Sequence, residues 1–79
     1  MQAWDFFHLG LKNFYKFGSK DNREAQRLFR QAVALDPNLA QAHAFLAYGI
    51  VLDMLYFDVK PDDRLLNEAE GLAKEGGAP

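Results

Sequence analysis

The stretch from Glu24 to Asn38 constrains the fold of this chain more than any other part of its sequence. Its apolar residues recur at spacings of three and four, with arginine and glutamine between them, which is the pattern of an amphipathic helix. Pro37 cannot continue that helix and biases Asp36 away from helical geometry. The stretch therefore predicts a helix that packs a narrow face against a neighbour and then stops sharply. Its apolar residues are Ala25, Leu28, Phe29, Ala32, Val33 and Leu35.

Three further segments have helical patterns. The first has apolar residues on more than one face and carries Gly10 near its middle, which indicates that another backbone passes close by. The third has an alanine-rich first half and a second half that is apolar nearly all round. No stretch alternates with period two, so no strand is expected. We predict an all-α fold with helices at about 3–17, 22–35, 39–55 and 61–75.

The sequence also predicts how these helices begin. Asp21 is expected to cap the second helix, with Glu24 at the capping-box position, and Asn38 to cap the third, with Gln41 in that role. Pro61 suits the first turn of the fourth helix, and Asp62 and Asp63 suit the positive end of its dipole. The inner face of that helix is expected to comprise Leu65, Leu66, Ala69, Leu72 and Ala73.

Composition excludes several functional classes. A net charge of −2 gives no basic surface for nucleic acid, and the absence of cysteine excludes disulfides and thiolate metal sites. The longest apolar run, 45–57, is interrupted by Gly49 and Asp53 and is too short for the ~20 residues of a membrane helix. The first ten residues lack the pattern of a signal peptide. We expect a single domain spanning 1–79, located in the cytoplasm, with no membrane insertion.

The helical segments repeat. The first and third segments align, as do the second and fourth, so that the chain contains two helix–turn–helix units of unequal length. The chain resembles the tetratricopeptide repeat family, whose motif places a glycine, an Ala-x3-Phe pair and a proline as Gly10, Ala25-x3-Phe29 and Pro37 stand here. The matching residues are Phe6, Leu9, Gly10, Asn13, Ala25, Phe29, Ala32 and Pro37 in the first unit, and His43, Leu46, Ala47, Ile50, Ala69 and Ala73 in the second.

The resemblance covers nearly the whole chain and implies a short α-solenoid, with unit one at 3–37 and unit two at 38–75. Both units are longer than the usual repeat, chiefly between Ala47 and Ala69. With these insertions, the two units are similar to the repeats that accompany bacterial class III adenylate cyclases and membrane-linked winged-helix transcriptional regulators. Unit two stops before a closing proline turn of its own. Because about three repeats are normally needed to bury their faces, a two-unit piece should expose apolar surface.

The resemblance also implies a binding surface. Members of the family present the first helix of each unit on a concave face, which here would be aromatic and apolar. Phe7 and Leu11 occupy slots where chaperone-tail-binding members use Lys and Asn, so a carboxylate clamp is not expected. We predict partner-binding residues at Trp4, Phe7, Leu11, Phe14, Tyr15 and Tyr48, with Gln41, Ala44, Val51 and Leu52 in the remaining slots of the second unit.

Two interpretations of this face remain open. It is either a groove for a helical or extended apolar segment of a protein partner, or a surface covered by insertions, a missing repeat or a second copy of the chain. The first predicts a protein–protein interaction module. The second predicts a self-association or structural segment of a larger bacterial signalling or regulatory protein, and possible homo-oligomers.

No catalytic or metal-binding constellation is evident in the sequence. His8 and His43 are the only histidines, and a metal site needs three or four convergent ligands. Ser19 is the only serine, so no Ser-His-Asp set exists. The acidic residues of the fourth segment and the arginine stripe of the second are expected to be solvated faces. We expect no enzymatic activity, no cofactor and no metal.

Overall fold

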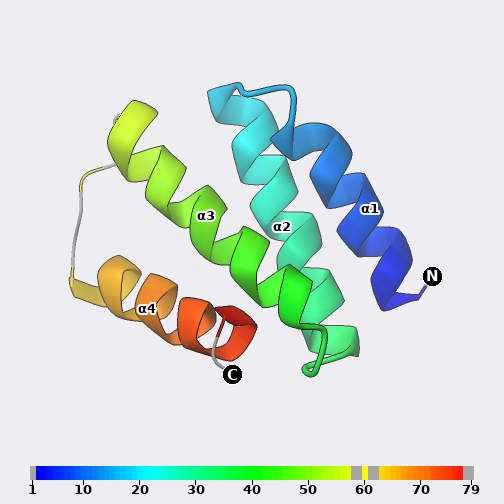
Figure 1. The fold of residues 1–79 in the computed structure, drawn as a ribbon. Coiled ribbons are helices and arrows are strands. Elements are labelled where there is room, and N and C mark those ends of the chain that lie inside the picture. The colour runs from blue at the N-terminus through cyan, green and yellow to red at the C-terminus, as the bar shows by residue number, and fades with distance from the viewer. Residues whose placement is uncertain (1, 58–59, 61–62, 78–79) are drawn as a thin grey trace.

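The computed structural model describes residues 2–57, 60 and 63–77, and these form four helices with no strand among them. The helices are α1 (Ala3–Phe14), α2 (Ser19–Leu35), α3 (Ala40–Tyr56) and α4 (Asp63–Gly77). Consecutive helices pack in pairs, α1 with α2 and α3 with α4, and α2 also packs against α3 (Figure 1). The predicted all-α fold with two helical hairpins is confirmed.

The turn between α1 and α2 differs from the prediction. Helix α1 ends at Phe14 rather than near Phe17, whose φ of 52° places it in the left-handed region that bulky residues seldom adopt. Helix α2 begins at Ser19 with Gly18 as its extended N-cap, so the predicted cap at Asp21 is wrong. The break in the chain is made by backbone geometry at 17–18, which leaves Asp21 inside the first helical turn.

The turn between α2 and α3 is organised by Asp36. Its carboxylate accepts a hydrogen bond from the Asn38 N–H (3.0 Å), and its carbonyl accepts one from the Leu39 N–H (3.1 Å). Leu39, not Asn38, is therefore the N-cap of α3. Buried His43 reaches back to this turn, with Nε2 2.7 Å from the Pro37 carbonyl oxygen.

Helix α4 also departs from its predicted range and inner face. It begins at Asp63 and continues to Gly77, and the predicted start at Pro61 and Asp62 lies outside the described residues. Ala69 is buried and Leu72 partly buried, as the predicted inner face requires, whereas Leu66 and Ala73 are exposed. The α4 face that meets the rest of the molecule is thus narrower than the sequence pattern indicates.

Four phenylalanine rings from three helices form the centre of the core. Phe29 of α2 has no exposed surface, and its ring centroid lies 5.8 Å from that of Phe7, 6.2 Å from Phe14 and 5.9 Å from Phe45. Phe45 of α3 also contacts both α1 rings, at 5.7 and 5.5 Å. Aromatic pairs at these separations contribute beyond the area that they bury. The cluster therefore ties α1, α2 and α3 together.

Gly10 makes room for this cluster. A Cβ atom at Gly10 would lie 2.5 Å from Cε1 of Phe29, a distance that real Cβ contacts do not show. The predicted close approach at Gly10 is thus present, but its partner is the Phe29 ring and not another backbone. Ala25, Ala47 and Ala69 are likewise buried, consistent with small residues where helices lie close together.

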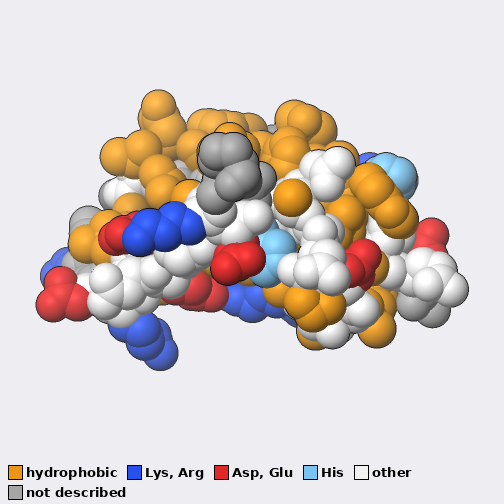
Figure 2. All heavy atoms as spheres, turned by 60° about the horizontal axis from the view of Figure 1, so that its bottom comes forward, with side chains coloured by type: hydrophobic (Ala, Val, Ile, Leu, Met, Phe, Trp, Pro, Cys, Tyr) orange, Lys and Arg blue, Asp and Glu red, His pale blue; other side chains and the backbone are white. Residues whose placement is uncertain are grey.

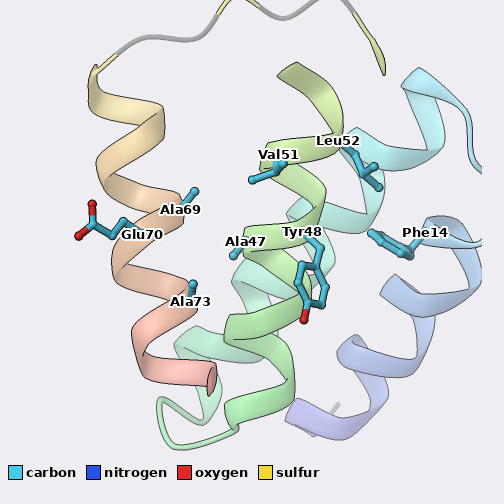
Figure 3. A pocket seen from close by; sticks show the side chains of 8 residues that line it. All are labelled: Phe14, Ala47, Tyr48, Val51, Leu52, Ala69, Glu70 and Ala73. Atoms are coloured by element: carbon cyan, nitrogen blue, oxygen red, sulfur yellow. The ribbon is translucent and has the colours of Figure 1, made fainter. Parts of the chain in front are cut away.

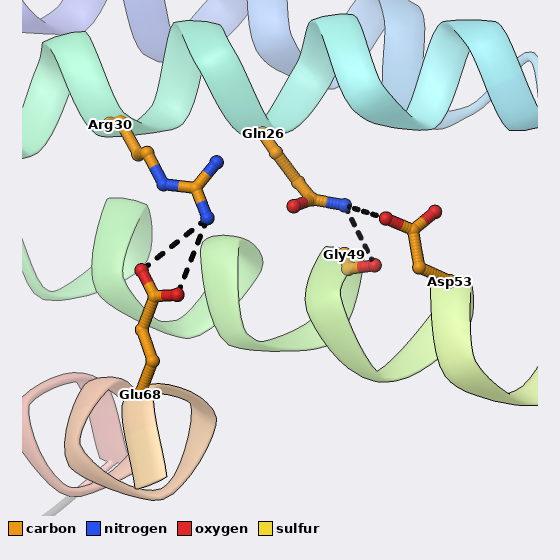
Figure 4. Close-up of polar contacts among 5 residues, drawn as sticks. All are labelled: Gln26, Arg30, Gly49, Asp53 and Glu68. Atoms are coloured by element: carbon orange, nitrogen blue, oxygen red, sulfur yellow. Dashed lines mark hydrogen bonds and ion pairs between the residues drawn. The ribbon is translucent and has the colours of Figure 1, made fainter. Parts of the chain in front are cut away.

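A buried polar cluster of Asn22, Gln26, Gly49 and Asp53 joins the two hairpins, and Figure 4 shows the last three of these residues. The Asn22 amide donates to the Gly49 carbonyl (2.8 Å) and to Asp53 Oδ1 (2.7 Å), and the Gln26 amide donates to the same carbonyl (3.1 Å) and to Asp53 Oδ2 (2.6 Å). An amide nitrogen has two N–H donors, so all four donors of the two side chains have acceptors. We call these four residues the amide–carboxylate cluster.

A second, exposed link joins α2 to α4. The guanidinium of Arg30 lies 3.4 Å from the Glu68 carboxylate, and both side chains are substantially exposed (Figure 4). Exposed pairs of this kind contribute about 0–1 kcal/mol. The stacking of the hairpins therefore depends on the buried cluster and the aromatic core much more than on this ion pair.

Candidate partner-binding groove

An open apolar groove of about 610 Å³ lies along α3, between α4 on one side and the end of α1 on the other (Figure 3). Helix α3 supplies its floor, α4 supplies one wall, and the ring of Phe14 closes the opposite side. The residues that line it are Phe14, Ala47, Tyr48, Val51, Leu52, Ala69, Glu70 and Ala73.

The sequence explains why this space is open. Ala69 and Ala73 lie one turn apart on α4, so the wall that faces α3 has short side chains. Larger apolar side chains rise from α3, where Val51 is 39% and Tyr48 56% exposed. Short side chains on one helix opposite long ones on the next leave a hollow that α3 and α4 do not fill themselves.

The polarity of the groove is low. Among the described residues that line it, Tyr48 and Glu70 are the only ones whose side chains carry polar atoms, and Glu70 is the only charged one. The Glu70 carboxylate lies 3.1 Å from Nζ of Lys74, and both side chains are largely exposed. The surroundings offer apolar contact along the groove and a negative charge on its rim. They offer no pair of groups for acid–base chemistry.

A clear shift in pKa occurs on the described surface away from this groove. On α2, the hydrogen bond from Arg27 lowers the pKa of Glu24, and the reverse effect raises the pKa of Arg27. Arg27 Nε lies 2.6 Å from Glu24 Oε1, and both side chains are about half exposed. This pair is an ordinary surface ion pair, so it does not indicate a reactive site.

The structure brings together three of the six residues predicted to bind a partner. Phe14 and Tyr48 both line the groove. Tyr15 is 69% exposed and its ring lies 5.6 Å from that of Phe14, so it extends the apolar surface past the end of the groove. Val51 and Leu52, predicted for the second unit, line the groove as well.

The other three predicted residues lie elsewhere. Phe7 is 4% exposed and belongs to the aromatic core, where a surface partner would not reach it. Leu11 is partly buried against the same core. Trp4 lines a separate, smaller hollow together with Leu35, where the start of α1 meets the end of α2. The predicted face is thus divided into core residues, the groove and an edge.

Sequence reasoning missed the α4 contribution to the groove, namely Ala69, Glu70 and Ala73, and also Ala47 of α3. Ala69 and Ala73 carry a usable signal, because small residues four apart on a helix leave space beside that face, which another helix or a groove can occupy. The sequence pattern places both Ala69 and Ala73 on the inner face of the hairpin, whereas in the structure Ala69 is buried and Ala73 is exposed.

Exposed apolar side chains extend beyond the groove. Figure 2 shows hydrophobic side chains gathered along one side of the molecule, whereas acidic and basic side chains lie mainly on the opposite side. Phe17 is 57% exposed, and its ring lies 5.6 Å from that of Tyr56, which connects the α1–α2 turn to the end of α3. The exposed large apolar residues are Trp4, Leu9, Tyr15, Phe17, Leu35, Tyr48, Val51, Leu55, Tyr56 and Leu66.

The described residues contain no group of three or more His, Asp or Glu side chains placed to hold a metal ion. Within the same residues, none of the four helices is long and apolar enough to cross a membrane. Comparisons with protein-family models, with curated proteins and with solved structures gave no match to this chain.

Proposed function

We propose that this chain is a non-enzymatic protein–protein interaction module of the tetratricopeptide type, and that it binds an apolar segment of a partner protein in the groove along α3. The groove itself is the observation that supports this proposal. It is open, it is lined almost wholly by apolar side chains from three helices, and an exposed apolar surface of this kind favours association.

The arrangement of the helices is consistent with the tetratricopeptide resemblance. Two hairpins stack through α2 and α3, and the small residues that mark the motif are buried at Gly10, Ala25, Ala47 and Ala69. In such an array the first helix of each hairpin faces a partner. Phe14 of α1 and Tyr48 and Val51 of α3 provide that face here.

The proposal predicts that Val51→Asp weakens partner binding at least tenfold, because the substitution places a charge where the partner's apolar side chains must lie. Peptides selected from a random phage-displayed library on the full chain serve as the probe, with affinities measured by fluorescence anisotropy. Leu55→Asp is the matched control, since Leu55 lies on the same helix, is 68% exposed and does not line the groove. Equal binding by both variants, or no enriched peptide, would contradict the proposal.

A second candidate function is self-association as a segment of a larger bacterial signalling or regulatory protein. The contact of Phe17 with Tyr56 favours it, because these exposed rings form an apolar surface outside the groove, and Phe17 adopts a strained backbone conformation there. Sedimentation equilibrium is then expected to give twice the chain mass of 9.0 kDa, and Tyr56→Asp to restore the single-chain mass. A single-chain mass for the parent protein at all concentrations would remove this candidate.

A further inference from the structure

We propose that one end of the molecule, where the α1–α2 turn meets the end of α3, binds the surface of a bilayer that contains anionic phospholipids. Phe17, Tyr56 and Phe57 form the apolar centre of this end, and we call these three residues the aromatic tip. None of them lines the groove, so the inference goes beyond the proposed function. Three features carry it: the exposed rings, the basic side chains beside them and the shape of the surface.

The aromatic tip brings together rings from segments that are far apart in the sequence. The ring centroid of Phe17 lies 5.6 Å from that of Tyr56 and 5.4 Å from that of Phe57, where the α1–α2 turn stands beside the end of α3 (Figure 1). Phe17 and Tyr56 nevertheless remain 57% and 63% exposed. The φ of 52° at Phe17 is a costly conformation for a bulky residue, and the ring gains no place in the core from it. An apolar cluster exposed in this way is typical of a contact surface.

Positive charge gathers beside the tip. The stretch 12–23 carries four basic residues and one acidic residue, a net charge of +3 in a chain whose net charge is −2. All four basic side chains are exposed, and none of them forms an ion pair or a side-chain hydrogen bond with the part of the chain that the structure describes. The balance stays positive when the charges of the segment 58–62, two aspartates and one lysine, are added. This end therefore offers uncompensated positive charge to an anionic surface. The four basic residues are Lys12, Lys16, Lys20 and Arg23.

The shape of this end favours a bilayer over a folded partner. The aromatic tip, Lys16 and Lys20 line none of the three hollows of the described surface, whereas protein partners usually anchor side chains in pockets. Aromatic rings enter the bilayer at the level of the headgroups, and flexible lysine side chains reach lipid phosphates without a fixed geometry. A second copy of the tip would bring like charges together, which opposes a dimer through this end. An anionic bilayer matches both the rings and the charge.

Co-sedimentation of the full chain with vesicles tests the proposal. Vesicles of phosphatidylcholine and phosphatidylglycerol in equal parts are the probe, and vesicles of phosphatidylcholine alone are the neutral comparison. The chain is expected to bind the anionic vesicles about tenfold more tightly, because each basic residue near such a surface adds to the attraction. Raising the salt from about 0.1 M to about 0.5 M should weaken this binding, since salt screens the attraction.

Two pairs of variants separate the tip from the rest of the surface. Phe17→Asn removes the ring, and asparagine tolerates the left-handed backbone, so the turn is retained. Leu35→Asn is its control, because Leu35 is equally exposed (56%) and lies at the other end of α2. Lys16→Gln removes a charge beside the tip, and Lys74→Gln removes one on α4. Phe17→Asn and Lys16→Gln should each weaken vesicle binding about fivefold, whereas the two controls should change it by less than about twofold. Circular dichroism checks that each variant is folded.

The other results each overturn the proposal. No binding to the anionic vesicles, equal binding to both kinds of vesicle, or equal effects of a variant and its control would exclude the bilayer. Binding to polyglutamate as tight as to the anionic vesicles, and independent of Phe17, would identify an acidic protein as the partner. A dimer that Phe17→Asn dissociates, without vesicle binding, would identify a second copy of the chain. Val51→Asp, in the groove, should leave vesicle binding unchanged, so this test fails or succeeds independently of the proposed function.

Discussion

Replacing Phe29 by alanine is expected to lower the free energy of unfolding by about 3–5 kcal/mol, the usual cost of truncating a buried phenylalanine. Phe29 has no exposed surface, and its ring contacts those of Phe7, Phe14 and Phe45. The truncation therefore opens a cavity where α1, α2 and α3 meet. A domain of this size has a total stability of about 4–12 kcal/mol, so the variant would lose a large fraction of it.

Urea denaturation followed by circular dichroism measures this effect. The midpoint of Phe29→Ala should fall by about 2 M or more, given the slopes typical of small proteins. Phe29→Leu, which retains more of the volume, should cost about 1–2 kcal/mol and provides a folded comparison if the alanine variant does not fold. Leu55→Ala is the control, since Leu55 is exposed and should change the stability by less than about 0.5 kcal/mol. Equal midpoints for Phe29→Ala and Leu55→Ala would refute the central role of the ring.

The fold could be predicted from the sequence because its main signals are local. Apolar spacing marks each helix, and Pro37 fixes one turn without reference to the rest of the chain. The helix starts were harder to predict, because a cap depends on backbone geometry as well as residue type. Asp21 and Asn38 are both good capping residues, yet Gly18 and Leu39 occupy the cap positions. In each case the local turn before the helix decides where the helix begins: the left-handed Phe17 precedes α2, and the Asp36 hydrogen bonds precede α3.

The candidate site was only partly predictable, because the tetratricopeptide resemblance implies binding residues only on the first helix of each unit, α1 and α3. Tyr48 and Phe14 line the groove as that assignment requires. Phe7 does not, because its place on α1 turns it toward Phe29 and Phe45 and away from solvent. The contribution of α4 depends on the angle at which α4 crosses α3, and spacing within one helix carries no information about that angle.

The amide–carboxylate cluster was not predicted at all. In the sequence, Gly49 and Asp53 interrupt an apolar run, and Asn22 and Gln26 lie among charged residues at the start of a helix. Their distances become short only when α2 packs on α3, since 27 and 31 residues separate Asn22 from Gly49 and from Asp53. Gly49 has a steric reason to be small as well, because a Cβ there would lie 3.0 Å from Cγ of Gln26.

The cluster leads to the second large prediction: Asp53→Ala is expected to lower the free energy of unfolding by about 2–4 kcal/mol. Asp53 is 8% exposed, and its carboxylate accepts hydrogen bonds from Asn22 and Gln26. Without it, each amide keeps its bond to the Gly49 carbonyl but loses an acceptor for its other N–H. A buried donor left without a partner costs about 1–3 kcal/mol. Gln41→Ala, an exposed polar substitution on the same helix, should have little effect.

A double-mutant cycle between Asp53 and Gln26 distinguishes this explanation from a simple loss of packing. Gln26→Met keeps the length of the side chain and removes one of the two amide groups that donate to Asp53, so Asp53→Ala should cost about 1 kcal/mol less in that background. The isosteric Asp53→Asn should be destabilising as well. The new side-chain amide would point its own N–H donors at the N–H donors of either Asn22 or Gln26, where the carboxylate accepts hydrogen bonds from both. Zero coupling in the cycle, measured by urea denaturation, would show that the hydrogen bonds are not what Asp53 contributes. Strong coupling would mean that α2 and α3 are held in register by a polar contact, and the stacking of the two hairpins in turn places Phe14 of α1 beside the groove residues of α3.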